Sequence, residues 1–311
     1  MNRTRITALY ITTLMLGLNV FGNEISPNEL LKKVAATYEA AKTYKAEGTI
    51  TADIDSNGMK VKTETSFSIL LKKPNLYLIS WSQNNTFMPS MVQSGAVWND
   101  GTQPYLYMGQ LNAYSKMTSD GIALSSATGI SGGAANTIPS LFFSVFKEQP
   151  DPLFQMKEPK IEKTEKIGDE DCYVLTGPSA FSKKETFWIS KTSYLIRKYC
   201  RSFEPPEGGS EIPKMTDEQL EKAIKDMGQE VTEESKKNVM EMMEESRTML
   251  TTAKLKGSSI ELHTTVSSPE LDKSDFKFAL PQGAILKNSL FDGIFGGNKE
   301  ISNKASDSDK K

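Results

Sequence analysis

The chain has 311 residues, with 37 Lys or Arg against 39 Asp or Glu, so its formal charge is −2. This balance lacks the excess of positive charge that binding to nucleic acid phosphates requires. Hydrophobic residues make up 38% of the chain and the mean hydropathy is −0.42, values typical of a soluble protein with a core. The composition therefore excludes nucleic acid as a partner and allows one large domain or two small ones.

The first 22 residues have the pattern of a secretory signal peptide. Arg3 and Arg5 supply a short positive region, residues 6–20 supply an apolar region, and residues 20–22 form a plausible cleavage site. The apolar run is shorter than the roughly 20 residues that a membrane span needs, which favours a cleaved signal peptide. An uncleaved membrane anchor is the alternative. The sequence therefore predicts a periplasmic protein with no integral membrane span in its mature form.

A helix is expected to begin at Pro27. Ser26 precedes it as N-cap, Pro27 takes the first helical position, and Glu29 occupies the capping-box position. Apolar residues then recur at helical spacing: Leu30, Leu31, Val34, Tyr38 and Ala41. This pattern predicts an amphipathic helix that ends near Thr43 and lies across the sheet that follows.

Residues 45–82 contain three successive segments in which apolar and polar residues alternate, 45–54, 61–71 and 76–82. A period of two places all apolar side chains on one face of a sheet. Turn-forming residues at 55–58 and 72–75 join the segments. The pattern predicts an antiparallel meander with one apolar face, which some other part of the molecule must cover.

The remaining elements follow in chain order. Strands are expected at 91–99, 105–108, 111–115, 155–167, 171–177, 184–190, 194–203 and 254–266, a loop or weak helix at 118–135, and a short apolar helix at 136–146. A Pro- and Gly-rich stretch opens an insertion at 204–253, which is helical and charged from 214 to 253. A turn-rich segment closes the fold at 267–284, and the tail is expected to be disordered over 297–311.

Six of the fourteen methionines fall within the insertion. One reading is a surface helical hairpin that uses methionine as an adaptable filler of its own contacts. The other is a lid whose methionine-lined face adapts to irregular apolar partners. Both readings place the helices between two strands of one domain.

Cys172 and Cys200 fall on the first and third strands of a predicted meander. Strands two apart lie roughly 9–10 Å from each other, whereas a disulfide needs a Cα separation below about 7 Å. Two buried free thiols are therefore expected, with a bridge as the alternative.

Five stretches keep an order typical of one exported family. They are TYKAEGTITADI, ETSFSILLKKPNLYLISW, IGDEDCYVLTG, ETFWISKTSYLIRKYCRSF and SSPELDKSDFKFALPQGA. Together they resemble the LolA/LolB-like superfamily of outer membrane lipoprotein carriers, and the DUF2092-type branch in particular. Two features depart from those carriers: the long helical insertion, and the lack of a counterpart to their entrance arginine.

The resemblance implies an α+β fold whose strongly curved antiparallel sheet forms an unclosed half-barrel with helices on its concave side. It implies a single LolA-like domain over 23–296, interrupted by the insertion at 204–253. Members of the superfamily hold acyl chains or lipoprotein lipid anchors on the concave side, and others sense mislocalised lipoproteins. The expected function is a non-enzymatic carrier of a lipid or of lipoprotein acyl chains.

Nine residues are expected to line an apolar cavity: Ile50, Phe67, Ile69, Tyr77, Ile79, Trp81, Trp188, Phe142 and Phe146. Each buried methylene contributes about 0.8 kcal/mol, so a dozen amount to roughly 10 kcal/mol before ordering costs. Alternatively, the helices fill the hollow and leave an ordinary core. The protein would then be an envelope sensor or scaffold that binds another protein through its sheet or its methionine-rich insertion.

Catalytic chemistry finds little support in the sequence. His263 is the only histidine, so the commoner zinc sites cannot be built, and no nucleophile elbow is present. Ser274 and Lys277 match a serine–lysine spacing, but they fall in a predicted turn. No enzyme activity and no cofactor are expected.

Overall fold

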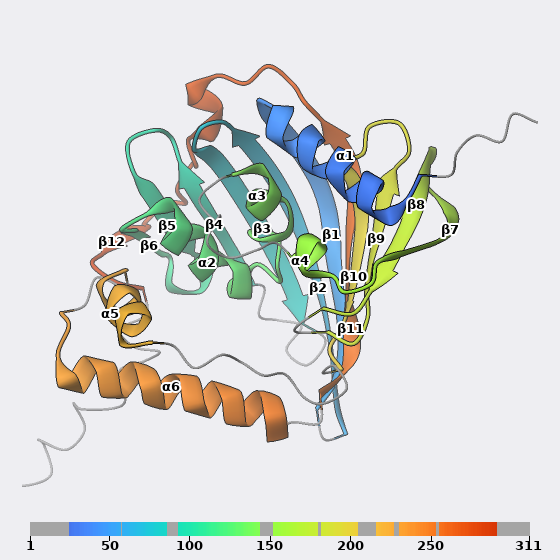
Figure 1. Ribbon diagram of the computed structural model, residues 1–311. Helices are drawn as coiled ribbons and strands as arrows, with labels where there is room; N and C mark the ends of the chain where they lie inside the picture. Colours follow the sequence, from blue (N-terminus) through green and yellow to red (C-terminus); the bar gives the residue numbers. More distant parts are fainter. Residues whose placement is uncertain are drawn as a thin grey trace, which may run out of the picture.

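The computed structural model describes residues 25–56, 58–85, 93–143, 152–179, 182–204, 216–226, 230–252 and 255–290. The predicted signal peptide and the predicted disordered tail lie outside these ranges. Within them, twelve strands form one sheet in the order β12-β6-β5-β4-β3-β2-β1-β11-β10-β9-β8-β7 (Figure 1).

The strands span β1 Thr43–Ser56, β2 Met59–Lys72, β3 Leu76–Asn85, β4 Gln93–Asn99, β5 Pro104–Met108, β6 Ala113–Lys116, β7 Lys160–Ile167, β8 Glu170–Gly177, β9 Glu185–Ser190, β10 Ile196–Ser202, β11 Leu255–Ser267 and β12 Ile285–Lys287. The α-helices span α1 Pro27–Ala40, α2 Asp120–Ile130, α3 Thr137–Phe142, α4 Pro152–Gln155, α5 Asp217–Asp226 and α6 Glu233–Thr252. Two 3₁₀ turns, η1 Gly109–Leu111 and η3 Lys273–Phe276, complete the described elements.

Local signals account for α1 and for the first three strands. The Ser26 side chain accepts a hydrogen bond from the Glu29 amide, and Leu30, Val34 and Tyr38 are buried. Strands β1, β2 and β3 pair in an antiparallel meander. The predicted helix and meander are therefore confirmed.

The sheet does not close into a barrel. Strand β11 follows the helical insertion and returns to pair with β1 on one side and β10 on the other. All neighbours are antiparallel except β12 and β6, which run parallel. The sheet bends around α1 to α4, which lie on its concave side (Figure 1). This is the expected α+β architecture with an unclosed half-barrel.

The main core lies between the concave face and the helices. It contains Leu30 and Tyr38 of α1, Leu124 of α2, Ile138 of α3 and Leu153 of α4, all fully buried. The convex face carries two smaller clusters. One, around Trp98 and Tyr107, is packed by Phe278; the other contains Cys172, Val174 and Trp188.

Several predicted boundaries shift. The weak helix expected within 118–135 is α2, and the helix expected over 136–146 is described only as α3, which ends at Phe142. The strand expected from 155 begins at Lys160, because residues 152–155 form the short α4.

The insertion places α5 and α6 between β10 and β11. Thr216 and Thr232 accept hydrogen bonds from the amides of Gln219 and Ser235 at the two helix starts. The two helices share a small core of their own, formed by Leu220, Ile224 and Val239 with Val231 and Met243. The hairpin therefore packs largely upon itself. No helix in the described part of the chain is long and apolar enough to cross a membrane.

Cys172 and Cys200 are free thiols on β8 and β10, separated by β9. Both pack against the same convex cluster. Burial raises the pKa of the Cys172 thiol to about 11, so this thiol stays protonated and unreactive at neutral pH. Both cysteines are unbridged in this structure, but only Cys172 is buried as expected, whereas Cys200 is partly exposed.

Candidate functional site

One row of residues crosses five strands of the concave face. The strand pairings align His263 with Gly48, Gly48 with Phe67, Phe67 with Trp81 and Trp81 with Gly95. A Cβ at Gly48 would lie 2.6 Å from the Phe67 ring, and one at Gly95 would lie 2.4 Å from the Trp81 ring. The two glycines thus make room for two aromatic rings at the centre of the face.

The structure brings together seven of the nine predicted cavity residues. Ile50, Phe67, Ile69, Tyr77, Ile79, Trp81 and Phe142 all belong to the main core, and none is more than 5% exposed. Helix side chains pack against them, so in the described part of the chain these residues form a closed core, the alternative to an open cavity. Phe146 lies outside the described residues.

Trp188 does not belong to this face, and its prediction as a cavity residue was wrong. Its neighbours Phe187 and Ile189 point into the main core, whereas Trp188 joins the convex cluster, and the Lys198 ammonium lies 4.2 Å from its ring centre. Every residue of β9 is buried. A strand buried on both faces shows no alternation that would reveal which residues point inward.

Residues 117–143, here called the cover segment, place α2 and α3 over the concave face (Figure 1). The buried side chains of α2 are only Ala123, Leu124 and Ala127. Gly132 and Gly133 follow α2 with φ angles of 67° and 111°, a region that favours glycine. Helix α2 therefore buries little apolar area, and other contacts must contribute to its attachment.

Asp120 attaches the first turn of α2 to the sheet. Its Oδ1 accepts hydrogen bonds from Asn99 Nδ2 at 2.7 Å and from the Tyr77 hydroxyl at 3.0 Å. Its Oδ2 accepts one from Asn75 Nδ2 at 3.3 Å. Burial, together with the charge of Asp120, raises the pKa of Tyr77 well above its usual value, so the phenol remains a donor.

Thr137 attaches the first turn of α3 to a buried polar group on β11. Its hydroxyl donates to Glu261 Oε2 at 2.6 Å, and Glu261 Oε1 lies 2.9 Å from His263 Nε2. The other ring nitrogen of His263 lies 3.4 Å from the Tyr44 hydroxyl. Glu261 and His263 are 3% and 0% exposed. Burial is also the main cause that raises the pKa of Tyr44.

Since a carboxylate only accepts hydrogen bonds, Nε2 of His263 carries the proton that faces Glu261. Nδ1 of His263 is then placed to accept a hydrogen bond from the Tyr44 hydroxyl. Both oxygens of Glu261 thus face donors, one from the sheet and one from the cover segment.

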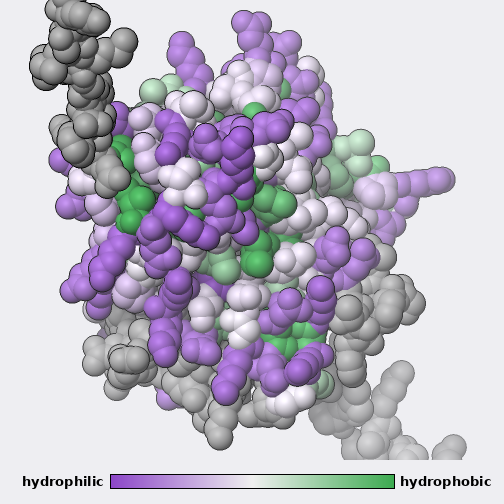
Figure 2. Space-filling view, turned by 90° about the vertical axis from the view of Figure 1, so that its right-hand side faces the viewer, coloured by the Kyte–Doolittle hydropathy of each residue, from purple (hydrophilic) through white to green (hydrophobic). Residues whose placement is uncertain are grey.

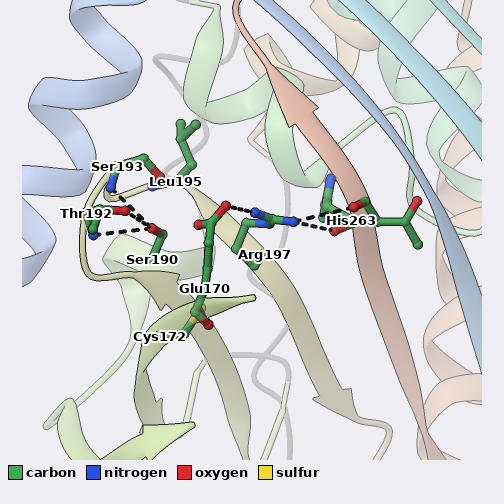
Figure 3. A network of polar contacts seen from close by, with 9 residues as sticks. Glu170, Cys172, Ser190, Thr192, Ser193, Leu195, Arg197 and His263 are labelled. Carbon is green, nitrogen blue, oxygen red and sulfur yellow. Dashed lines mark hydrogen bonds and ion pairs between the residues drawn. The ribbon is translucent and has the colours of Figure 1, made fainter. Parts of the chain in front are cut away.

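Where β10 and β11 are not paired with each other, side chains form hydrogen bonds with their backbone groups. The two strands pair from Lys198 opposite Leu262 onward. Before that point, Arg197 Nη2 donates to the carbonyl oxygens of His263 and Thr264 at 3.4 and 3.5 Å, and its other nitrogen pairs with Glu170 (Figure 3). The Tyr38 hydroxyl of α1 accepts the Ile196 amide at 3.2 Å.

Sequence reasoning missed these polar groups as parts of the site. The available signal was the spacing of Glu261 and His263, which are two apart in a predicted strand and therefore share one face. For Asp120 and Thr137 no comparable local signal exists, because their partners are distant in sequence.

The face seen in Figure 2 is mostly hydrophilic, with apolar residues gathered in small separate patches. The covered concave face is an extended apolar surface within the fold. These features define a half-barrel protein whose apolar face is closed by its own helices. The chain belongs to the DUF2092 family, described as "Predicted periplasmic protein", which matches residues 28–216. The protein is accordingly periplasmic.

Several solved structures are similar at low identity. An uncharacterised conserved protein from Thermus thermophilus is 10% identical, with 85% of this chain and 99% of that chain covered and a TM-score of 0.39. LprF from Mycobacterium bovis is 7% identical, covering 79% and 94%, with a TM-score of 0.39. A LolA superfamily protein from Nitrosomonas europaea is 11% identical, covering 82% and 99%, with a TM-score of 0.27. No curated protein matches the chain.

Proposed function

We propose that this protein is a non-enzymatic carrier, which holds a lipid or the acyl chains of a lipoprotein on its concave face. The cover segment moves aside and the apolar guest takes its place. The observation that carries this proposal is an extended apolar face closed by a segment whose longer helix, α2, buries mainly small side chains and which polar contacts attach to the sheet.

The free energy gained by burying an acyl chain is comparable to the free energy gained by packing the cover segment on the same face. An acyl chain of twelve methylenes gains roughly 10 kcal/mol on burial before ordering costs. The cover segment buries four large apolar side chains, Leu124 of α2, Ile138 and Phe142 of α3, and Phe143 directly after it, together with small ones such as Ala123 and Ala127. A full burial of one large side chain is worth about 1.5–3 kcal/mol, and each hydrogen bond about 0.5–1.5 kcal/mol. A guest of this size therefore competes with the cover.

Mass spectrometry of an organic extract tests the proposal directly. Protein purified from the periplasm is expected to carry lipid in a fixed ratio. The same protein, unfolded and refolded without lipid, serves as the control. An extract no richer in lipid than this control counts against a carrier.

The three tryptophans allow the position of the guest to be measured. Trp81 lies on the concave face, whereas Trp98 and Trp188 lie in convex clusters. A W98F/W188F variant retains only Trp81. Its fluorescence is expected to be quenched by a brominated fatty alcohol, because bromine quenches tryptophan only at close range.

The W81F variant, which keeps the two convex tryptophans, is the matched control and should be quenched much less. Equal quenching in both proteins would show that the hydrocarbon chain of the probe binds elsewhere or associates nonspecifically, and would contradict binding on the concave face.

A second candidate function is binding of another envelope protein at the edge of the sheet. Within the described residues β12 is the last strand on its side, and Ile285, Leu286 and Leu111 are 53%, 52% and 41% exposed. An extended partner segment adds to such an edge as a further strand. Periplasmic cross-linking tests this: an I285K/L286K variant should lose the cross-linked species while keeping its lipid.

A further inference from the structure

Glu261 is a buried carboxylate in a mainly apolar face, whose other buried polar side chains include His263 and Thr65. Its strand neighbours are Ile50 of β1 and Tyr199 of β10, and Tyr199 stacks on Phe187 with ring centres 4.4 Å apart. A carboxylate in such a place is costly unless donors satisfy both oxygens. The closed protein meets this requirement through His263 and Thr137.

The two donors to Glu261, His263 and Thr137, belong to different parts of the molecule. His263 lies on the same strand as Glu261, and Tyr44 of β1 supports its second nitrogen, so this contact stays with the sheet. Thr137 belongs to the cover segment. When the cover segment leaves, Oε2 of Glu261 loses its donor while remaining flanked by apolar side chains.

We infer that Glu261 binds the polar end of the guest, and that this end is a hydrogen-bond donor without negative charge, such as a hydroxyl or an ammonium group. The inference rests on the proposed function and adds the class of guest. The donor occupies the position of the Thr137 hydroxyl, and the hydrocarbon chain runs from Glu261 over Phe67 and Trp81. A guest ending in a carboxylate or phosphate would place a like charge against Glu261, which disfavours it in a desolvated site.

The nearby charges agree with this selectivity. The cationic Arg197 is engaged by Glu170 and by the carbonyl oxygens of His263 and Thr264. Arg197 therefore satisfies backbone carbonyl groups where β10 and β11 separate. The charged group that meets a guest on the concave face is the carboxylate of Glu261.

Competition binding with three ligands of equal chain length tests the inference. Dodecanol, dodecylamine and dodecanoate, each below its aggregation limit, compete with the brominated fatty alcohol for the W98F/W188F protein at pH 7.5. Dodecanol and dodecylamine are expected to bind at least about tenfold more tightly than dodecanoate. Three equal affinities overturn the inference while the carrier function stands, and no binding by any of the three overturns the carrier function itself.

Two substitutions separate the role of the charge from that of the fold. In E261Q the preference for dodecylamine over dodecanoate should fall to within about threefold. In T137V, where the cover loses its donor but keeps its shape, all three ligands should bind severalfold more tightly with their order unchanged.

E162Q, which removes a partly exposed carboxylate on β7, is the control and should match the parent in every affinity. Unchanged selectivity in E261Q contradicts the inference. If E261Q does not fold, the ligand order in T137V decides: a lost preference for the two donor ligands contradicts it.

Discussion

Asp120 shows how a single side chain can hold a helix with few large apolar residues against a sheet. It collects donors from β3, from β4 and from the turn between β2 and β3. Its position at the first residue of α2, after the N-cap Ser119, also places its negative charge at the favourable end of the helix dipole.

Replacing Asp120 by Ala should lower the free energy of unfolding by about 1–3 kcal/mol. The reason is that Asn99, only 3% exposed, keeps a buried amide without its acceptor. Urea unfolding followed by circular dichroism measures the change. D53A on the exposed side of β1 is the control and should stay within about 0.5 kcal/mol of the parent; an equal loss in both variants would contradict the role given to Asp120.

The raised pKa of Tyr77 predicts that the folded protein loses stability at alkaline pH. Its pKa in the folded protein is raised above the unfolded value near 10, so above that pH the unfolded chain binds fewer protons than the native one. The contribution is complete below about pH 10 and declines as the pH rises further, by at most about 1.4 kcal/mol per pH unit.

The comparison between parent and Y77F isolates this effect. Urea unfolding at pH 8, 10 and 11 should show the parent losing stability more steeply than the variant above pH 10. Parallel slopes would mean that Tyr77 ionises equally in both states.

At the scale of elements, the helical insertion adds mass without adding strands. The Phe203 amide donates to the Gly257 carbonyl at 3.0 Å, and Ser202 pairs with Ser258, so β10 and β11 are adjacent where the insertion begins and ends. The core shared by α5 and α6 is separate from the main core.

Replacing residues 205–255 by Asn-Gly should therefore leave the sheet folded, since a two-residue turn fits an antiparallel pair. The β-type circular dichroism should persist and the midpoint of urea unfolding should change little. Cooperative unfolding that disappears in this variant would show that the helices support the sheet.

At the scale of the whole molecule, stability is expected to be uneven. The central strands β1 and β2 are paired on both sides along most of their length. The cover segment is held by four large buried side chains, by small ones and by a few polar contacts. Local opening follows such differences.

Native-state hydrogen exchange should find the amides of α2 and α3 exchanging well before those of β1 and β2, and T137V should speed α3 without affecting β2. Exchange of the cover and the central strands at one common rate would contradict an independently opening cover.

The sequence alone determined the elements whose causes are local. The cap at Ser26, the alternation in β1 and β2, and the threonines that start α5 and α6 each act within a few residues, so periodicity and capping predicted them. The general nature of the concave face also followed, because residues such as Ile69 and Ile79 lie on alternating strands. The membership of DUF2092 and the unclosed half-barrel came from the order of such stretches.

Which groups meet across the face depends on how distant parts of the chain pack together. Thr137 and Glu261 are 124 residues apart, and Asp120 and Tyr77 are 43 apart, so strand order and helix placement bring them together. Trp188 was assigned to the wrong face because β9 is buried on both sides. Local sequence sets the period of a strand, but the packing of distant strands and helices decides what each face touches.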